Sequence, residues 1–203
     1  MHIICSDLEG VFVPEIWINV AERTGIDDLR LTTRDISDYD VLMKRRLSIL
    51  DANGLKLKDI TDVIAGMDPL PGARAFLDWL RARTQVVVVS DTFVEFARPL
   101  MEKLGWPTLL CHNLTVDANG AIVGYNLRQA DGKRQVVQAF RRLNYQVLAM
   151  GDSYNDVAML KEADQGILFR PPQNVIEEYP DYPVATTYGE LKVIFGKELD
   201  GKQ

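Results

Sequence analysis

The sequence predicts an α/β fold built on a parallel sheet. Short apolar runs typical of buried strands alternate with longer stretches whose apolar residues recur at helical spacing. Strands that alternate with helices pair in parallel through right-handed crossovers. Three of the strand runs end in polar residues, at Asp7, at residues 90–92 and at Asp152. Ligands bind at the carboxyl ends of such strands, so these polar segments are the first candidates for a site.

The first predicted strand, Ile3 to Ser6, carries Asp7 out of its carboxyl end, and Glu9 and Gly10 follow. On a continuing extended backbone the two carboxylates point to the same side, because side chains alternate along a strand. Such a pair suits a nucleophile and a neighbouring proton donor. A solvated turn would have the same sequence, so this segment predicts a catalytic site only in combination with motifs elsewhere in the chain.

A block of predicted helices separates this strand from the next. The helices cover residues 14–25, 38–53 and 57–66. Three helices without an intervening strand indicate an inserted cap rather than part of a sheet. We therefore expect residues 14–70 to form a helical cap domain, and residues 1–13 and 71–203 to form the core.

The rest of the chain alternates between the two kinds of element. Predicted helices at 73–83, 93–104 and 133–143, one that runs on to Ala163 and one at 191–195 separate strands at 85–92, 146–150, 166–169 and 183–186. Residues 113–127 alternate between apolar and polar around Asn119-Gly120, a strong hairpin signal. The role of this hairpin stays open at this stage, with shielding of a sheet edge as one option.

Composition narrows the class of function. The 203 residues are 47% hydrophobic and 26% charged, with a net charge of -6, which is ordinary for a globular protein. No basic stripe predicts a nucleic-acid partner, and no apolar run approaches the roughly 20 residues of a membrane span. Cys5 and Cys111 match no disulfide or zinc pattern, and a buried thiol is expected for Cys5. The sequence begins without signal-peptide features, so the cytoplasm is the expected location.

The acidic residues at the predicted strand ends form a candidate metal site. Asp7 and Asp152, with Asp156 behind them, offer the hard oxygen ligands that Mg²⁺ prefers. This ion keeps several waters, so two carboxylates and a backbone carbonyl suffice to hold it.

Hydrogen-bond donors and a cation complete the candidate site. Ser90 offers a hydroxyl, Lys133 a positive charge and Asn155 an amide, which together suit a phosphoryl dianion. A carboxylate nucleophile, Mg²⁺, a lysine and a hydroxyl describe phosphoryl transfer through an aspartyl-phosphate. Each residue alone is explained by a turn, a helix cap or a solvated surface, but their joint occurrence at element ends favours a site.

The chain resembles the haloacid dehalogenase superfamily of phosphotransferases. The matching motifs are residues 7–10, residues 90–92, Lys133 and residues 151–156, which span most of the core. The resemblance implies a Rossmann-like core with a cap, in agreement with the helical block after the first strand.

The resemblance also implies a role for each core residue. Asp7 would be the nucleophile and Glu9 the general acid and base, while Lys133 offsets the repulsion between carboxylate and phosphate. The magnesium ligands would be Asp7, the backbone carbonyl of Glu9 and Asp152, with Asp156 in support.

Within the superfamily the chain resembles the phosphoserine phosphatases. Glu15 stands where those enzymes place an acid for the substrate ammonium, and the segment that begins at Tyr39 resembles their cap helix, whose arginine grips the substrate carboxylate. By that pattern Tyr39 and Arg46 are substrate-binding residues, and Lys44 or Arg45 replaces Arg46 if the register differs. A planar guanidinium suits a carboxylate better than an ammonium does.

Two positions depart from the usual pattern. Glu9 stands where the second acid is usually Asp, and Ser90-Asp91-Thr92 replaces Ser-Gly-Gly. The extra methylene moves the proton donor by about 1 Å, and Asp91 adds a charge near the polar end of the substrate. Both departures resemble the variant that transfers the phosphoryl group to water or to the hydroxyl of homoserine.

The sequence thus predicts Mg²⁺-dependent phosphotransfer from L-phosphoserine to water, to L-homoserine or to both. Two alternatives stay open: the same chemistry on another small phosphomonoester, such as a sugar phosphate or nucleotide, and a non-catalytic module that kept the fold. The complete motif set argues against the second. Small molecules are the expected partners, and the oligomeric state stays open, with a homodimer as one option.

Overall fold

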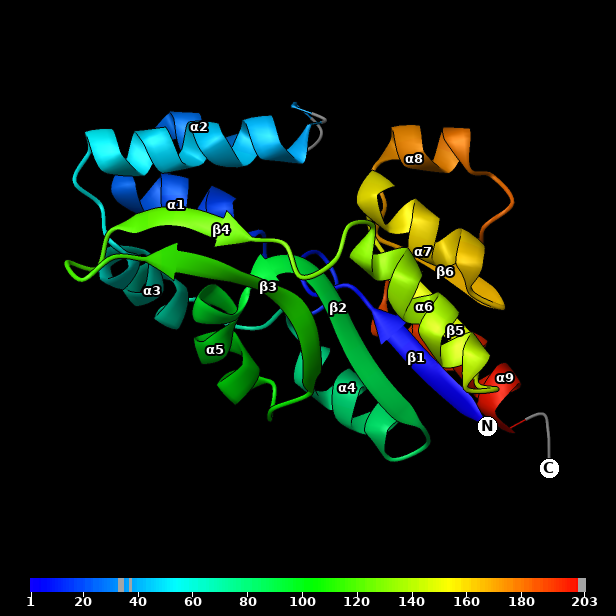
Figure 1. Cartoon of the computed structure of the whole chain (residues 1–203). Coiled ribbons are helices and arrows are strands. Elements are labelled where there is room, and N and C mark those ends of the chain that lie inside the picture. Colours follow the sequence, from blue (N-terminus) through cyan, green and yellow to red (C-terminus); the bar gives the residue numbers. More distant parts are fainter. Residues whose placement is uncertain (33–34, 37, 201–203) are drawn as a thin grey trace.

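Seven strands form one sheet in the order β4-β3-β2-β1-β5-β6-β7 (Figure 1). This computed structural model describes residues 1–32, 35–36 and 38–200. The strands are β1 His2–Ser6, β2 Gln85–Phe93, β3 Thr108–Val116, β4 Ile122–Asn126, β5 Gln146–Gly151, β6 Gln165–Phe169 and β7 Val184–Ala185. Neighbours pair in parallel, except for the antiparallel β3 and β4. The predicted α/β class, parallel sheet and hairpin are confirmed.

Helices connect these strands. They are α1 Ile16–Thr24, α2 Tyr39–Ala52, α3 Leu57–Ala65, α4 Ala73–Arg81, α5 Val94–Lys103, α6 Gly132–Arg142, α7 Val157–Glu162, α8 Gln173–Glu178 and α9 Tyr188–Asp200, with short 3-10 turns η1 Asp27–Arg30 and η2 Tyr154–Asp156. The sequence did not predict α8, because six residues show too little periodicity, and it placed the start of β3 five residues late. None of the helices in the described part of the chain is long and apolar enough to cross a membrane.

The two faces of the sheet are covered by different helices, because successive strand side chains point in opposite directions. Ile4, Val88, Leu148 and Met150 pack in a core with α4, α5 and α9, whereas Ile3, Cys5, Val89 and Ala149 pack with α6, α7 and α8. Cys5 is a buried free thiol, as predicted. Because both faces of the sheet are buried, the register of the strands is fixed, and this register positions the site.

The central strand β1 lies between β2 and β5, and this order brings three polar segments together. Ser6 is in register with both Val88 and Met150. The backbone nitrogen of Asp7 continues this pairing by donating to the carbonyl oxygen of Met150 at 3.1 Å. The carboxyl ends of β2, β1 and β5 therefore open onto the same edge of the sheet.

Helix α2 packs against β4 of the β3–β4 hairpin and lies above it in Figure 1. The backbone nitrogen of Leu57 donates to the carbonyl oxygen of Gly120 at 2.9 Å. The hydroxyl of Tyr125 donates to the carboxylate of Asp40 at the start of α2. The hairpin, whose role the sequence left open, is thus a support for the inserted helices.

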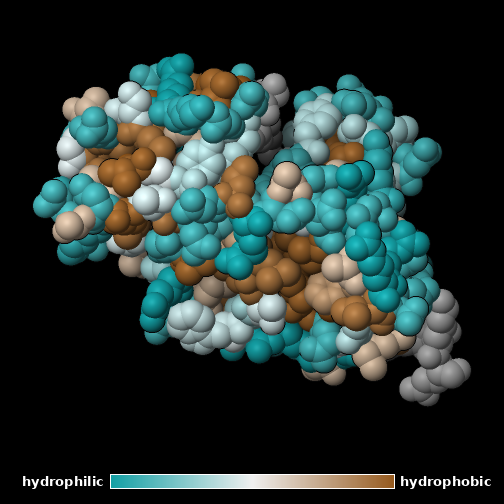
Figure 2. Space-filling view, in the orientation of Figure 1, coloured by the Kyte–Doolittle hydropathy of each residue, from teal (hydrophilic) through white to brown (hydrophobic). Residues whose placement is uncertain are grey.

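Figure 2 shows apolar residues gathered beside α6, over β2 and β3. Val89 and Leu110 from the strands and Val136 and Ala139 from α6 line a cavity of about 320 Å³ at this place. The cavity reaches Asp91 and Lys133 at its inner end, so it adjoins the site described next.

Candidate active site

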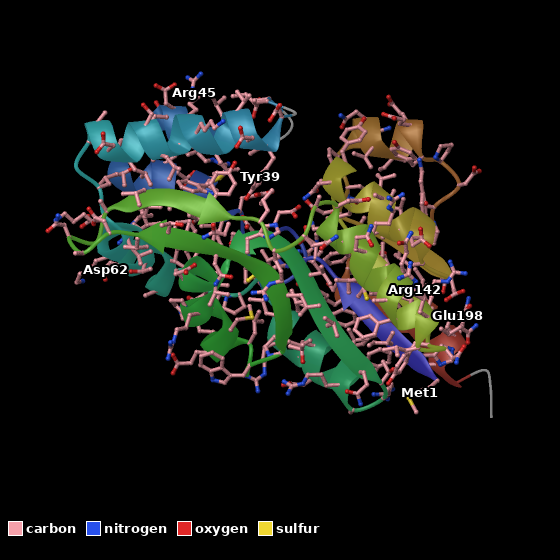
Figure 3. All side chains as sticks on the ribbon, viewed as in Figure 1. Met1, Tyr39, Arg45, Asp62, Arg142 and Glu198 are labelled. Atoms are coloured by element: carbon pink, nitrogen blue, oxygen red, sulfur yellow. The ribbon has the colours of Figure 1, made fainter. Side chains whose placement is uncertain are left out.

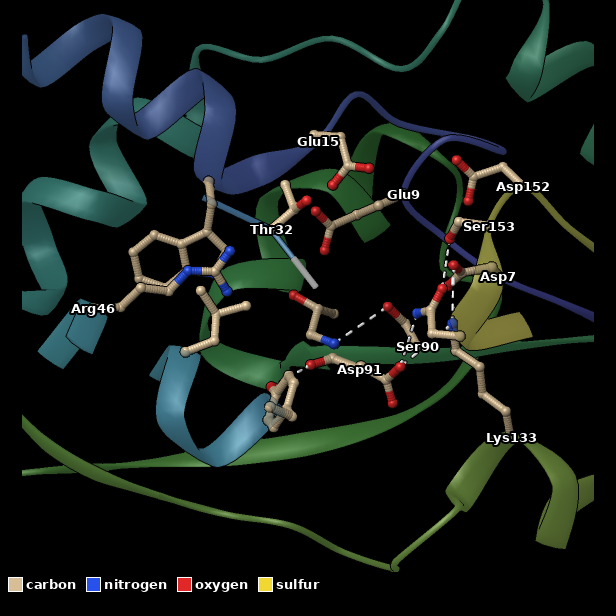
Figure 4. A pocket seen from close by; sticks show the side chains of 15 residues that line it. Asp7, Glu9, Glu15, Thr32, Arg46, Ser90, Asp91, Lys133, Asp152 and Ser153 are labelled. Atoms are coloured by element: carbon tan, nitrogen blue, oxygen red, sulfur yellow. Dashed lines mark hydrogen bonds and ion pairs between the residues drawn. The ribbon is translucent and has the colours of Figure 1, made fainter. Parts of the chain in front are cut away.

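A cavity of about 80 Å³ opens at the carboxyl edge of the sheet, beneath the inserted helices (Figure 4). Its walls contain the predicted residues Asp7, Glu9, Glu15, Tyr39, Arg46, Ser90, Asp91, Lys133, Asp152 and Asn155, and also Trp17, Thr32, Leu42, Thr92 and Ser153. Of the residues proposed for the site from sequence, only Asp156 lies outside its lining. The fold therefore gathers groups that are up to about 150 positions apart in the sequence.

Lys133, at the start of α6, is the electrostatic centre of the cavity. Its Nζ lies 2.9 Å from Asp7 Oδ2, 2.8 Å from Asp156 Oδ1 and 3.5 Å from Asp91 Oδ2. Burial acts to lower the pKa of Lys133, but the three carboxylates outweigh it and raise that pKa well above its usual value. The lysine therefore carries its charge at any physiological pH.

Asp156 lies behind the cavity and is fully buried. Its Oδ1 faces Lys133, and its Oδ2 accepts hydrogen bonds from the backbone nitrogens of Asp152 at 2.9 Å and Ser153 at 3.1 Å. Both of its oxygens are thus engaged in holding the lysine and the loop after β5. This arrangement suits a supporting carboxylate better than an outward-facing ligand.

Two glycines make this packing sterically possible. A Cβ at Gly151 would lie 2.3 Å from the side chain of Asp156, and one at Gly10 would lie 2.4 Å from Asp152 Oδ2. Gly10 also has a φ of +72°, a left-handed conformation that favours glycine. The sequence motifs contain both glycines, but the sequence alone gave neither a role in positioning the carboxylates.

The acidic residues fit a hard divalent cation. Oxygen atoms of Asp7, Asp152 and Asp156 all lie within 4.8 Å of one another, and the residues are buried. With Asp7 ionised, these three carboxylates and the single ammonium of Lys133 carry a charge of -2. Burial first, and then the repulsion from Asp156, raise the pKa of Asp7 despite Lys133. A buried oxygen cluster with this excess charge is what a divalent cation binds.

Glu9 faces the cavity at the amino end of α1. Its Oε2 accepts a hydrogen bond from the backbone nitrogen of Ile16 at 2.8 Å. Burial first, and then the charge of Glu15, raise the pKa of Glu9 to about 8, although the bond from Ile16 and the charge of Arg46 act against the rise. Glu9 therefore holds a proton at neutral pH, which is what a general acid requires.

Arg46 lies at the opposite end of the cavity from Lys133 (Figure 4). Its guanidinium carbon lies 4.5 Å from the ring centroid of Trp17, and its Nη2 donates to the carbonyl oxygen of Leu31 at 2.7 Å. The Nε atom is buried without a hydrogen-bond partner in the described part of the chain. A buried guanidinium with unused donors is a receptor for a planar anion.

The neighbouring Arg45 points away from the cavity (Figure 3). It pairs with exposed Asp28 at 2.8 Å, and Lys44 pairs with Asp40, which is also exposed. Of the three basic residues that the sequence offered, only Arg46 lines the cavity.

Asp91 connects the inserted helices to the core. Its backbone oxygen accepts a hydrogen bond from the hydroxyl of Tyr39 at 2.9 Å, and its Oδ2 accepts one from Asn155 Nδ2 at 3.0 Å. Ser90 turns its Oγ toward the backbone nitrogen of Thr92 at 3.3 Å. The end of β2 is thereby fixed to both sides of the cavity.

Sequence reasoning missed part of the lining. The ring of Trp17 is buried, and it also forms the surface on which Arg46 lies. Thr32 and Ser153 carry no helical or strand pattern that distinguishes them from ordinary loop residues. Only the convergence of loops from different parts of the chain reveals them.

This α/β protein has an acidic site at the carboxyl ends of three parallel strands. Residues 26–164 match the haloacid dehalogenase-like hydrolase family. A Pseudomonas aeruginosa protein named phosphoserine phosphatase ThrH is 62% identical over 97% of this chain and 96% of its own length. A phosphoserine phosphatase of Pseudomonas syringae pv. tomato is 61% identical over 97% of this chain and 83% of its own. The chain therefore belongs to the haloacid dehalogenase-like hydrolase family, as its motifs predicted.

Solved structures agree with the fold. A phospho-aspartyl intermediate analogue of phosphoserine phosphatase aligns with a TM-score of 0.78 at 19% identity, covering 96% of this chain and 98% of that one. A substrate-bound phosphoserine phosphatase complex aligns with a TM-score of 0.76 at 18% identity, covering 96% and 97%. The likeness extends over the sheet and the inserted helices alike.

The raised pKa of Glu9 predicts a pH-dependent stability. The folded protein keeps a proton on Glu9 up to about pH 8, whereas the unfolded chain releases it near 4.5. The folded state thus loses stability as pH rises between these values. Glu9→Gln should remove this loss, so that the metal-free variant gains at least about 1.4 kcal/mol relative to wild type between pH 5 and pH 8. Urea unfolding in a chelator at the two pH values measures the difference.

The control is Glu102→Gln on the exposed surface of α5. It should shift the free energy of unfolding equally at the two pH values. If Glu9→Gln behaves in the same way as Glu102→Gln, Glu9 is ionised in the folded protein and is not a proton donor at neutral pH.

Proposed function

We propose that this chain is a Mg²⁺-dependent phosphotransferase that takes the phosphoryl group of L-phosphoserine and passes it to water, to L-homoserine or to both. Membership of a hydrolase family and 62% identity to a protein named phosphoserine phosphatase ThrH support the phosphoserine reaction. The departures at Glu9 and Asp91 support an acceptor other than water, because both alter the polar surroundings of the leaving and entering hydroxyl.

The observation that carries this proposal is the distribution of charge along the cavity. Asp7 and Lys133 lie at one end, whereas Glu15 and Arg46 lie toward the other (Figure 4). Phosphoserine carries a phosphate, an ammonium and a carboxylate. Lys133 complements the first, Glu15 the second and Arg46 the third, so a single orientation of the substrate matches all three charges.

The size of the cavity supports the same substrate class. A volume of about 80 Å³ is well below the roughly 300–1,000 Å³ of sites for drug-sized ligands. A nucleotide would need the inserted helices to move away, whereas an amino-acid phosphate requires only a small enclosed space. A sugar phosphate has no use for Arg46 or Glu15, since it lacks both the carboxylate and the ammonium.

In the first chemical step, a carboxylate oxygen of Asp7 attacks phosphorus and the bond from phosphorus to the serine oxygen breaks. Glu9 gives its proton to that oxygen, so serine leaves as a neutral alcohol. Lys133, Ser90 and Asn155 hold the equatorial oxygens, on which charge is spread in the transition state.

In the second step, Glu9 takes a proton from water or from the acceptor hydroxyl. The oxygen of that group attacks phosphorus, and the bond from phosphorus to Asp7 breaks. The same glutamate thus serves as acid and then as base, and the enzyme returns to its starting protonation state.

The acidic residues would hold the metal ion. The ligands we propose are Asp7, the backbone carbonyl of Glu9 and Asp152, with Asp156 in support from behind. When bound, Mg²⁺ would offset the repulsion between carboxylate and phosphate and stabilise charge on the phosphoryl oxygens.

We further propose that residues 14–70 act as a cap domain over a catalytic core of residues 1–13 and 71–203. The two connections lie side by side, since the backbone nitrogen of Leu70 donates to the carbonyl oxygen of Phe12 at 2.9 Å. Such a paired connection suits a hinge. Motion of the cap about this hinge would open the cavity, so that substrate enters and serine leaves.

Phosphate release from L-phosphoserine with Mg²⁺, measured with and without L-homoserine, tests the proposed reaction. We expect turnover that ceases on Asp7→Asn, because the amide cannot form the acyl phosphate, while circular dichroism shows an unchanged fold. Phosphohomoserine formed at the expense of phosphate would establish the transferase. Retained turnover in Asp7→Asn would contradict the aspartyl-phosphate mechanism.

Arg46→Ala tests the recognition of the carboxylate. We expect KM for phosphoserine to rise by about tenfold or more, since a charge-assisted pair that contributes about 1.5–3 kcal/mol is lost. Arg45→Ala, one residue away on the outer surface, is the matched control and should keep the wild-type KM. If Arg46→Ala also keeps it, Arg46 does not bind the substrate carboxylate, and another small phosphomonoester becomes the favoured substrate.

A further inference from the structure

His112 lies on β3, beside the cavity but outside the set of residues with an assigned role. Its side chain is buried, and its Nδ1 accepts a hydrogen bond from the backbone nitrogen of Arg128 at 3.2 Å. A ring nitrogen that accepts carries no proton, so the proton of the neutral ring is on Nε2. That nitrogen lies 3.6 Å from Asp91 Oδ1. The imidazole therefore presents an N–H to the carboxylate of Asp91.

The carboxylate of Asp91 is a junction between donors. Its Oδ1 faces His112, while its Oδ2 accepts from Asn155 Nδ2 at 3.0 Å and lies 3.5 Å from Lys133 Nζ. Burial raises the pKa of Asp91, but Lys133, His112 and Asn155 outweigh it and hold that pKa below its usual range. One ionised side chain thus contacts both nitrogen donors that are proposed to receive the phosphoryl oxygens.

The segment that leads to Lys133 is attached at the same place. Arg128 donates from Nε to the carbonyl oxygen of Cys111 at 2.8 Å and from Nη2 to Asn113 Oδ1 at 3.2 Å. With the bond from its backbone to His112, three contacts hold this segment to β3. The two ring nitrogens of His112 therefore connect the approach to α6 with the carboxylate that contacts Lys133.

We propose that His112 is a positioning residue for phosphoryl transfer: its Nε2–H holds the carboxylate of Asp91 against Lys133 and Asn155, and so fixes the direction of those two donors. The inference deepens the proposed function and rests on it. A displacement of about 1 Å at reacting groups can cost on the order of a hundredfold in rate, so a group that only aligns donors has a measurable effect.

Two polar, uncharged substitutions distinguish the roles of the two ring nitrogens of His112. His112→Gln places an amide donor near the position of Nε2, whereas His112→Asn places an acceptor near Nδ1 and leaves no donor that reaches Asp91. We expect His112→Gln to keep kcat within about threefold of wild type and His112→Asn to lose about tenfold, which corresponds to roughly 1.4 kcal/mol. KM for phosphoserine should change less than about twofold in both, because Arg46 and Glu15 are untouched.

A double-mutant cycle tests whether His112 acts through Asp91. In an Asp91→Asn background, His112→Asn should have almost no further effect on kcat, because the carboxylate that it orients is gone. His2→Asn, on the half-buried histidine at the far end of β1, is the control for loss of a histidine side chain and should keep wild-type kinetics. If His112→Asn does not fold, the kcat of Asp91→Asn is the remaining test of the positioning role. It must then be at least about tenfold below that of wild type.

The outcomes separate this inference from the proposed function. Wild-type protein that turns over no phosphoserine overturns both. Turnover by wild type, with His112→Asn unchanged or with both His112 variants equally slow, overturns the positioning role alone. An equal loss from His112→Asn with and without the Asp91 carboxylate also overturns it, as does an unchanged kcat in Asp91→Asn.

Discussion

The buried ammonium of Lys133 is the interaction on which the rest of the site depends. It is in contact with carboxylates from the ends of β1 and β2 and from the loop after β5, so the three strand ends are held together by one charge. Removing a single partner from such a buried network leaves uncompensated charge, which costs about 3–5 kcal/mol in other proteins. The order of the strands brings these carboxylates together, and the charge of Lys133 offsets the repulsion between them.

The same cluster explains why the site is suited to a phosphoryl group and a metal ion. Burial first, and then the repulsion from Asp156, raise the pKa of Asp7, because Lys133 neutralises only part of the negative charge. A divalent cation would lower the pKa of Asp7 and so favour the ionised form, in which a carboxylate is a nucleophile. At the other end of the cavity, the charges of Glu9 and Glu15 act on Arg46, but its Nε has no hydrogen-bond partner among the residues described. The cavity therefore suits a ligand that itself carries charged groups.

The sequence predicted the sheet, the helical insertion and most of the cavity lining, because each depends on short local patterns. Asp7 and Asp152 could be found since each follows a buried strand, and Ser90 since it lies near the carboxyl end of one. The supporting groups could not be found in this way. His112 lies within a strand whose start was placed too late, and its meaning depends on Arg128 and Asp91, which only the tertiary fold brings to it.

The covalent intermediate tests the central claim most directly. Wild-type protein mixed with radiolabelled L-phosphoserine and Mg²⁺, stopped with acid within one turnover and digested, should yield a labelled peptide that contains Asp7. Hydroxylamine should release the label, because an acyl phosphate is cleaved by that nucleophile. Turnover without label on Asp7, or with label on Ser90, would contradict the account.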